Sequence, residues 1–355
     1  MHNQVIMAVV QPPAKILLTG ANGFFAVHAI KDLLQRGYTV VGTVRSAAKG
    51  EELVRLFPEY TDKLSYAVVP DIVKPGAFDQ VIKEGGFDGV GHAASPVNAP
   101  GGTPEEYIRP AIDGSLGILE SIKQHGSTVK RVVVTSSFVT MLHFQKGLKH
   151  TEEHWNDAVL NLVEQKGDKA APGELYTASK TLAEKAVWKF MKDNEGKVSF
   201  DLATINPCLM LGEPIHAVTS RDQLTSVSVL MSEVAKPRPE SELGNESFPV
   251  GHVKDVAAIH SAIFSRPDAA GHRVVAIESS PSWQDIYDAL NEEPAFPGAL
   301  KGNPGVGKLP DTGAAGWDTA YAKELLGRDF IGAKEMIRET EAYFQKKGWS
   351  FLTGA

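Results

Sequence analysis

Short apolar runs alternate with helix-length amphipathic segments along residues 14–207, and this alternation restricts the fold more than any other feature. Buried parallel strands are typically short continuous apolar runs. Strands that alternate with helices form βαβ units with right-handed crossovers. We therefore predict an α/β chain with a doubly wound parallel sheet. The predicted strands are 14–19, 38–44, 64–69, 87–92, 131–135 and 200–205, and the helices between them are 24–35, 47–57, 78–83, 105–124 and 174–193.

A glycine-rich turn, TGANGFFA at residues 19–26, joins the first predicted strand to the first predicted helix. Gly20 can form the tight turn, and Gly23 lets the backbone come close to a pyrophosphate. The N–H groups at the start of the helix then attract the phosphates. Such a turn is common in proteins, but its place between a strand and a helix predicts a Rossmann-type dinucleotide site. The expected cofactor contacts here are Gly20, Asn22, Gly23, Phe24 and Phe25.

Residues that follow the next strands indicate which dinucleotide binds. Arg45 ends the second strand and Lys49 lies nearby. A guanidinium pairs well with a ribose 2′-phosphate, whereas an acidic residue here would bind a 2′-hydroxyl. We therefore predict NADPH (or NADP+) as the cofactor, with a solvated strand-end cation as the alternative reading of Arg45. The third and fourth strands are followed by further expected cofactor contacts, which are Asp71, Ile72, Ala93 and Ala94. Asp71 can also be a plain turn residue.

Composition argues against several other classes of protein. The chain has 36 Lys and Arg against 43 Asp and Glu, a net charge of −7, which disfavours a nucleic-acid or anionic-membrane surface. Cys208 is the single cysteine, so a reducing compartment is the simplest expectation. No signal peptide or membrane-length apolar run is visible. We expect a cytoplasmic protein, a monomer or homodimer, with no metal and no nucleic-acid or membrane partner.

The alternation ends at Pro207. Residues 213–250 are polar and interrupted by prolines, and residues 297–316 are rich in glycine and proline. We predict a smaller C-terminal substrate-binding lobe, built from insertions. The expected division is an N-terminal extension (1–13), a nucleotide-binding domain (14–207) and mainly the lobe (208–355), with about 251–265 packing back on the first domain. The predicted elements after residue 250 are a strand at 272–278 and helices at 253–264, 282–290 and 333–346.

Tyr176 and Lys180 lie four residues apart in the predicted helix 174–193, so they project from one face. A tyrosine hydroxyl can give a proton to a carbonyl oxygen while a hydride reaches the carbon. A nearby ammonium favours the phenolate and eases this proton transfer. The same lysine can hold the nicotinamide ribose, and we expect both Tyr176 and Lys180 to contact the cofactor. The sequence TSS at 135–137, after the fifth strand, offers a hydroxyl for the substrate oxygen.

In their order along the chain, these motifs resemble those of the extended short-chain dehydrogenases/reductases. Within that superfamily the chain is similar to the dihydroflavonol reductase-like group, nearest to fungal NADPH-dependent methylglyoxal and aldehyde/ketone reductases. The resemblance covers nearly the whole chain from residue 14. It rests on TGANGF at 19–24, GTVRS at 42–46, PDI at 70–72, HAASP at 92–96, RVVVTSS at 131–137, TEEHW at 151–155, YTASKTLAEKAVW at 176–188, INPCLMLGEP at 205–214 and GHVKDVA at 251–257.

The resemblance implies NADPH-dependent reduction of a small aldehyde or ketone to an alcohol. It assigns the catalytic roles to Ser137, Tyr176 and Lys180, with Tyr176 as the proton donor. It also implies nicotinamide contacts from the backbone between Pro207 and Met210, and it points to Ser226 as a phosphate contact. The family's third turn glycine is Ala26 here, which changes little. The Asn-Trp-Tyr-Cys signature of cinnamoyl-CoA reductases is missing, which disfavours a CoA thioester substrate.

Two other functions stay open. One is a nucleotide-sugar epimerase or dehydratase of the same superfamily, which Arg45 disfavours because such enzymes usually take NAD. The other is a non-catalytic NADPH-binding sensor. Three local patterns are expected to be coincidental. HTEEH at 150–154 resembles a zinc motif, whereas GNPGVGK at 302–308 and TGAAG at 312–316 resemble nucleotide-binding turns without the flanking strand.

Overall fold

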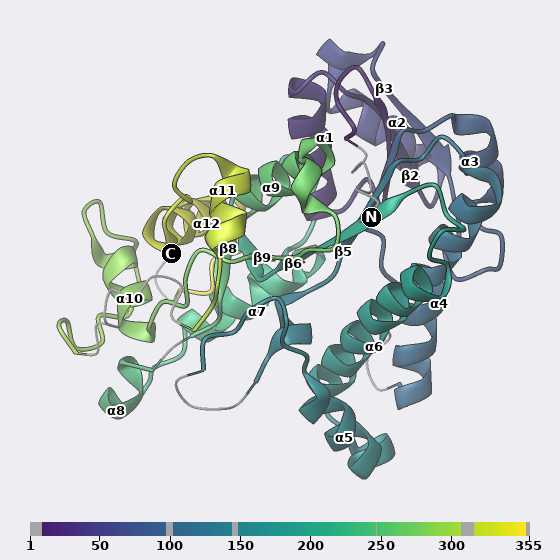
Figure 1. Cartoon of the computed structure of the whole chain (residues 1–355). Helices are drawn as coiled ribbons and strands as arrows, with labels where there is room; N and C mark the ends of the chain where they lie inside the picture. The colour runs from purple at the N-terminus through teal and green to yellow at the C-terminus, as the bar shows by residue number, and fades with distance from the viewer. Residues whose placement is uncertain (1–8, 97–101, 144–147, 246, 307–315, 353–355) are drawn as a thin grey trace.

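The computed structural model describes residues 9–96, 102–143, 148–245, 247–306 and 316–352. Its main sheet has seven parallel strands in the order β3-β2-β1-β4-β5-β6-β9 (Figure 1). The strand order reverses between β1 and β4, which confirms the predicted doubly wound α/β fold. The strands are β1 (Lys15–Thr19), β2 (Thr39–Val44), β3 (Leu64–Val68), β4 (Gly89–His92), β5 (Arg131–Thr135), β6 (Asp201–Pro207) and β9 (Arg273–Ala276).

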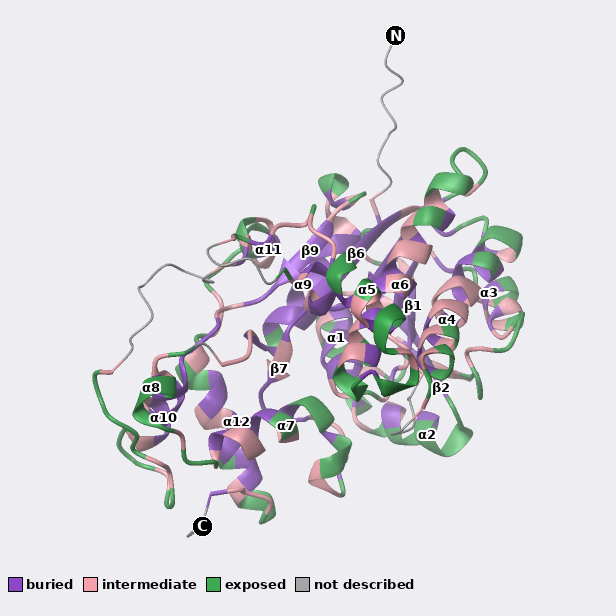
Figure 2. Ribbon diagram, turned by 90° about the horizontal axis from the view of Figure 1, so that it is seen from below, coloured by how far each residue is buried: buried purple, intermediate pink, exposed green. Residues whose placement is uncertain are grey.

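Helices cover both faces of this sheet, and each face has its own apolar core. Buried residues of α1 (Phe24–Gln35), α2 (Ala47–Arg55), α9 (Val253–Ser265) and α11 (Ala320–Leu326) form the core on one face. The other core is formed with α3 (Asp79–Gly85), α4 (Pro104–His125) and α6 (Pro172–Asp193). Figure 2 shows the buried residues along the strands and the exposed residues on the outer sides of the helices. The two cores account for the continuous apolar runs of the strands, since a sheet covered on both faces has no solvent side.

A smaller lobe lies to one side of the sheet (Figures 1 and 2). It contains the two-stranded sheet of β7 (Leu209–Leu211) and β8 (Val250–His252). Buried apolar side chains of these strands and of the lobe's helices form a separate core. The helices are α7 (Thr225–Val234), α8 (Glu240–Leu243), α10 (Trp283–Asn291) and α12 (Ala333–Lys347).

The strand predicted at 272–278 does not belong to this lobe. As β9 it pairs in parallel with β6, with Thr204 opposite Arg273, and becomes the last strand of the main sheet. The helix α9 packs on α1 of the same domain. The chain thus returns to the first domain after entering the lobe. The pairing of β9 with β6 was hidden in the sequence because a short apolar strand does not reveal its partner.

The described part of the N-terminal extension is docked on the sheet domain. Val10 is buried, its N–H donates to the Phe264 carbonyl at 3.0 Å, and its carbonyl accepts from the Tyr38 hydroxyl at 2.8 Å. Across the described ranges, no helix is long and apolar enough to span a bilayer. One helix that the sequence analysis missed, α5 (Asp157–Lys166), begins at Asn156, whose side chain accepts from the N–H of Val159.

Candidate active site

A groove of about 940 Å³ lies at the carboxyl ends of β1, β2, β3 and β4. This is the edge of a doubly wound sheet at which ligands bind, because the loops diverge where the strand order reverses. The groove therefore coincides with the predicted dinucleotide site. Nine of the residues expected to contact the cofactor line it, namely Gly20, Asn22, Gly23, Arg45, Lys49, Asp71, Ile72, Ala93 and Ala94.

The turn after β1 touches the loop after β4, and this contact requires a glycine. Gly20 has φ +67°, and a Cβ placed on it would lie 2.9 Å from Ala94 Cα. Thr19 stabilises the same contact between the two loops. Its Oγ1 accepts a hydrogen bond from the Ala94 N–H at 3.0 Å and lies 2.9 Å from His92 Nδ1. Burial lowers the pKa of His92 to about 3, with a smaller contribution from the charge of Lys180. The neutral ring can then accept the Thr19 hydroxyl proton, so His92 is a buried structural residue that supports the contact between these two loops.

The start of α1 is suited to a pyrophosphate. Gly23 is the N-cap residue, no side chain caps the helix, and no acidic residue lies in its first turn. The N–H groups of the first turn and the positive end of the helix dipole are thus left for an anion. The side chain of Phe24 lies edge-on against His28 and lines the adjoining cavity, whereas Phe25 is buried against His260. Neither side chain lines the groove itself, so the groove meets these two residues at most through their backbone N–H groups.

The charged residues after β2 and β3 differ in whether their side chains already have a polar or charged partner. Arg45 is exposed at the groove, and it has no acidic partner within 4.0 Å among the described residues. Lys49 instead pairs with Glu52, with 2.8 Å between Nζ and Oε2. Asp71 is exposed, and its Oδ1 accepts from the Val73 N–H at 3.0 Å. Arg45 therefore offers the stronger free charge for a 2′-phosphate, and Asp71 serves at least as a turn residue.

The predicted catalytic residues come from two elements, the turn after β5 and the helix α6. Ser137 follows β5 and begins a short 3-10 helix, with its Oγ accepting from the Val139 N–H at 3.4 Å. Tyr176 lies in the second turn of α6 with 42% of its surface exposed. Lys180, one turn further along α6, donates from Nζ to Ser95 Oγ at 3.3 Å. Ser95 lines the groove, so the Lys180 ammonium is at the edge of the groove.

A second cavity of about 630 Å³ adjoins the groove and shares Asn22, Gly23 and Lys49 with it. Its other walls come from α1, α2 and residues 216–225 of the lobe. The predicted phosphate contact Ser226 lines neither cavity, although its neighbour Thr225 lines this second one. No sequence pattern indicates this cavity, since the residues on its lobe side carry no motif.

The segment predicted to meet the nicotinamide carboxamide crosses from the sheet to the lobe. Pro207 is buried at the end of β6, and Met210 lies half-buried in β7. Cys208, between them, is also buried, and burial raises the pKa of its thiol. Its Sγ lies 3.4 Å from the Ala276 carbonyl oxygen. Cys208 is therefore a small buried side chain of the packed interior.

The side chains of the HTEEH segment have partners other than a metal ion. His150 stacks on Trp317, with 4.4 Å between ring centroids, and His154 Nδ1 accepts from the Thr151 N–H at 3.0 Å. Glu152 contacts His272 Nδ1 at 2.9 Å. Within the ranges that the structure describes, no three metal-ligating side chains are grouped. The other two patterns, 302–308 and 312–316, lie partly outside the described residues.

The sheet, the switch-point groove and the glycine turn define a dinucleotide-binding protein of the Rossmann class. The model of the NAD dependent epimerase/dehydratase family matches residues 16–277. The chain therefore belongs to this family, and the resemblance found in its motifs is confirmed.

Reductases are among the similar proteins. The chain is 35% identical over 344 residues to the NADPH-dependent methylglyoxal reductase of Saccharomyces cerevisiae, an alignment that covers 93% of this chain and 98% of that protein. It is 33% identical over 328 residues to a ketoreductase of Aspergillus niger, covering 89% and 93%. The crystal structure of the yeast methylglyoxal/isovaleraldehyde reductase complexed with NADPH superimposes with a TM-score of 0.79 at 33% identity, covering 94% of this chain and 99% of that one.

Proposed function

We propose that this protein is an NADPH-dependent carbonyl reductase that converts a small aldehyde or ketone into an alcohol. The observation that carries the proposal is the contact between Lys180 and Ser95, because it brings the Tyr-x-x-x-Lys helix to the edge of the groove. The exposed Arg45 supports NADPH in preference to NADH. The names of the yeast and Aspergillus relatives, as reductases of carbonyl compounds, support the same reaction.

NADPH supplies the hydride when it is bound. The uncapped start of α1 would hold its pyrophosphate, and Arg45 would hold its 2′-phosphate. In our proposal Tyr176 carries the proton that the carbonyl oxygen receives, and its exposure leaves the hydroxyl accessible to a substrate. Ser137 donates a hydrogen bond to the same oxygen and orients it. Lys180 places a positive charge beside this site and binds the nicotinamide ribose.

The two alternatives are less well supported. A nucleotide-sugar epimerase or dehydratase would usually hold NAD, for which an acidic residue at position 45 would be suited. A sensor that binds NADPH without turnover would have no need of Ser137, Tyr176 and Lys180 together. We further propose a cytoplasmic location, which the single cysteine favours, and a monomer or homodimer, which light scattering on the purified protein would establish.

The test is NADPH consumption by the purified protein with a panel of aldehydes, diketones and aryl ketones. Tyr176→Phe removes the proton and keeps the ring. Its kcat should fall by about 10²–10⁴-fold on every accepted substrate, while the Kd for NADPH stays within about twofold. Tyr60→Phe, in the turn after α2, is the matched control and should keep the wild-type rate.

If Tyr176→Phe retained the full rate, the proposed mechanism would be wrong. Tightly bound NAD in the purified protein, together with no NADPH consumption on any carbonyl, would favour the epimerase alternative. NADPH binding without turnover on the whole panel would favour the sensor.

A further inference from the structure

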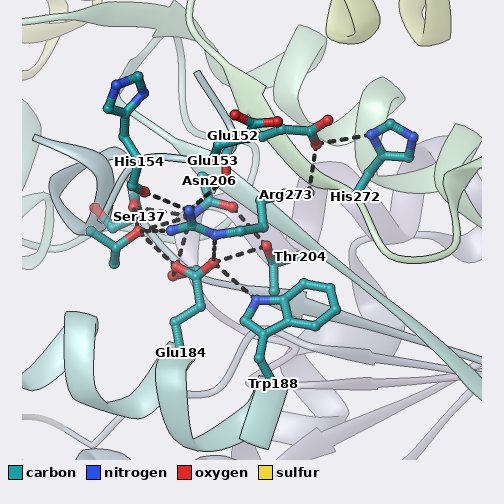
Figure 3. Close-up of polar contacts among 12 residues, drawn as sticks. Ser137, Glu152, Glu153, His154, Glu184, Trp188, Thr204, Asn206, His272 and Arg273 are labelled. Carbon is teal, nitrogen blue, oxygen red and sulfur yellow. Dashed lines mark hydrogen bonds and ion pairs between the residues drawn. The ribbon is translucent and has the colours of Figure 1, made fainter. Parts of the chain in front are cut away.

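A buried ion pair ties the helix that carries Tyr176 and Lys180 to the last strand of the sheet. Glu184 of α6 and Arg273 of β9 lie 2.6 Å apart between Oε1 and Nε, and their side chains are 1% and 7% exposed. Charges so far from water are stable only when both are paired and hydrogen-bonded. The surroundings of the pair meet this requirement (Figure 3).

Glu184 accepts hydrogen bonds from several strands at once. Burial raises the pKa of its carboxyl group, but the charge of Arg273 and the hydrogen bonds from Arg273 and the hydroxyl groups lower it by more. The pKa of Glu184 is thus below its ordinary value. Glu184 is therefore ionised at neutral pH. Its donors besides Arg273 are Ser136 Oγ, Thr140 Oγ1 (2.7 Å), Asn206 Nδ2 (2.9 Å), Thr204 Oγ1 (3.2 Å) and Trp188 Nε1 (3.4 Å).

Two of these donors, Thr140 and Asn206, also hydrogen-bond to the backbone carbonyl oxygen of Ser137. Asn206 Nδ2 lies 3.2 Å from the Ser137 carbonyl oxygen, and Thr140 Oγ1 lies 2.9 Å from it. Asn206 has two amide protons and can donate to Ser137 and Glu184 together. Thr140 has one hydroxyl proton, which can serve either acceptor in turn. The peptide that carries the Ser137 hydroxyl is thus held by groups that Glu184 itself holds.

Arg273 extends the same network to the segment before α5. Its Nη1 donates to the carbonyl oxygens of Glu152 at 2.7 Å and His154 at 2.6 Å. Its guanidinium lies over the ring of Trp155, with 3.6 Å from Cζ to the ring centroid. One buried cation therefore fixes β9, α6 and the chain that follows the TSS sequence.

We propose that Glu184 and Arg273 are positioning residues that hold Ser137 in a fixed relation to Tyr176 and Lys180. Tyr176, Lys180 and Glu184 are spaced by four residues along α6, so they share one face of that helix. Glu184 joins this face to the end of β5, where Ser137 lies. This inference rests on the proposed function, in which both hydroxyls meet one carbonyl oxygen. A displacement of about 1 Å at such a site can reduce the rate about 10²-fold.

The test compares this ion pair with a second one, which is partly buried and lies within the main sheet. Glu184→Gln keeps the shape of the side chain and removes its charge. Asp201→Asn does the same to the pair of Arg131 and Asp201, which has the same 2.6 Å separation and a fully buried arginine, but joins β5 and β6 at the amino ends of the strands. The readouts are the fraction folded, the Kd for NADPH, and kcat and KM from single-turnover and steady-state reduction.

We expect Glu184→Gln to lower kcat per folded molecule by about tenfold or more, with the Kd for NADPH within about twofold of the wild type. Asp201→Asn should lower stability and leave kcat within about twofold. Thr140→Val, which removes a donor to Ser137 and keeps the ion pair, should lower kcat by about three- to tenfold. If Glu184→Gln does not fold, the kcat of Thr140→Val still tests whether this network positions Ser137.

Equal kcat losses in Glu184→Gln and Asp201→Asn would overturn the proposal, because the effect would then be loss of stability alone. Wild-type kcat in Thr140→Val, together with a large loss in Ser137→Ala, would overturn it as well. A failure of the proposed function itself is distinguishable from both results. In that case the wild type would reduce no carbonyl, or Ser137→Ala and Tyr176→Phe would keep the full rate.

Discussion

Replacement of Gly20 by alanine probes the contact on which the groove depends. Two costs follow from the structure. The first is the backbone conformation, since φ is +67° and a left-handed residue with a Cβ costs about 1–2 kcal/mol. A more restricted unfolded chain offsets about 0.4–1 kcal/mol of this cost. The second is steric, because the new Cβ would lie 2.9 Å from Ala94 Cα, a backbone atom that has to move. Such overpacking costs about 1–3 kcal/mol.

Gly86→Ala separates these two costs. Gly86 has φ +58°, and a Cβ there would meet nothing within 4 Å. It should lower the free energy of unfolding by about 1 kcal/mol or less. Gly20→Ala should lower it by about 2–4 kcal/mol, and it should also weaken NADPH binding because Ala94 lines the groove.

Urea unfolding and fluorescence titration with NADPH measure the two effects. Equal destabilisation in the two variants, with unchanged NADPH affinity in both, would refute the idea that the close approach of Gly20 to Ala94 shapes the groove.

Two further changes test the charge at the groove and the buried core. Arg45→Ala should lower kcat/KM for NADPH about tenfold at low salt and leave that for NADH unchanged, whereas Lys83→Ala, an exposed control on α3, should alter neither. A parallel loss for both cofactors would contradict the assignment of Arg45. Burial lowers the pKa of His260 to about 3, so the unfolded chain takes up a proton there between pH 6.5 and 3 while the folded protein does not. Stability should fall as the pH falls through this window, and His260→Leu should reduce that fall. Thermal unfolding with the same pH dependence in both proteins would show that His260 contributes nothing to it.

Strong local patterns were sufficient for much of the main sheet. The helix α1 and the strand β5 lie at the predicted residues, 24–35 and 131–135, because periodicity, glycine punctuation and continuous apolar runs agree there. The lobe was harder to predict. The helix α7 buries Val227, Leu230 and Met231 at helical spacing, but prolines and polar residues surround it and mask the signal. The strands β7 and β8 have three residues each, too few for a periodicity.

In the candidate site, too, some residues were predictable from local patterns and others were not. Turn glycines and a strand-end arginine are local in sequence, and they identify residues of the groove directly. The Tyr-x-x-x-Lys pair is equally local, and its lysine contacts Ser95 at the edge of the groove. Glu184 was part of a recognised motif, yet nothing in the sequence pairs it with Arg273, which lies 89 positions further along the chain. A buried ion pair between distant residues leaves no spacing pattern.

The alternating strands and helices, the glycine turn and the order of the chemical motifs can all be recognised from the residues alone. These features depend on local geometry, that is, on helical and strand periodicity and on the few conformations that a turn allows. Three contacts are visible only in the folded chain: β9 pairs at the end of the main sheet, the turn at Gly20 packs against Ala94, and Glu184 forms an ion pair with Arg273 next to the backbone of Ser137. Those contacts join residues far apart in the chain, and burial selects them by shape and charge once the strands have come together.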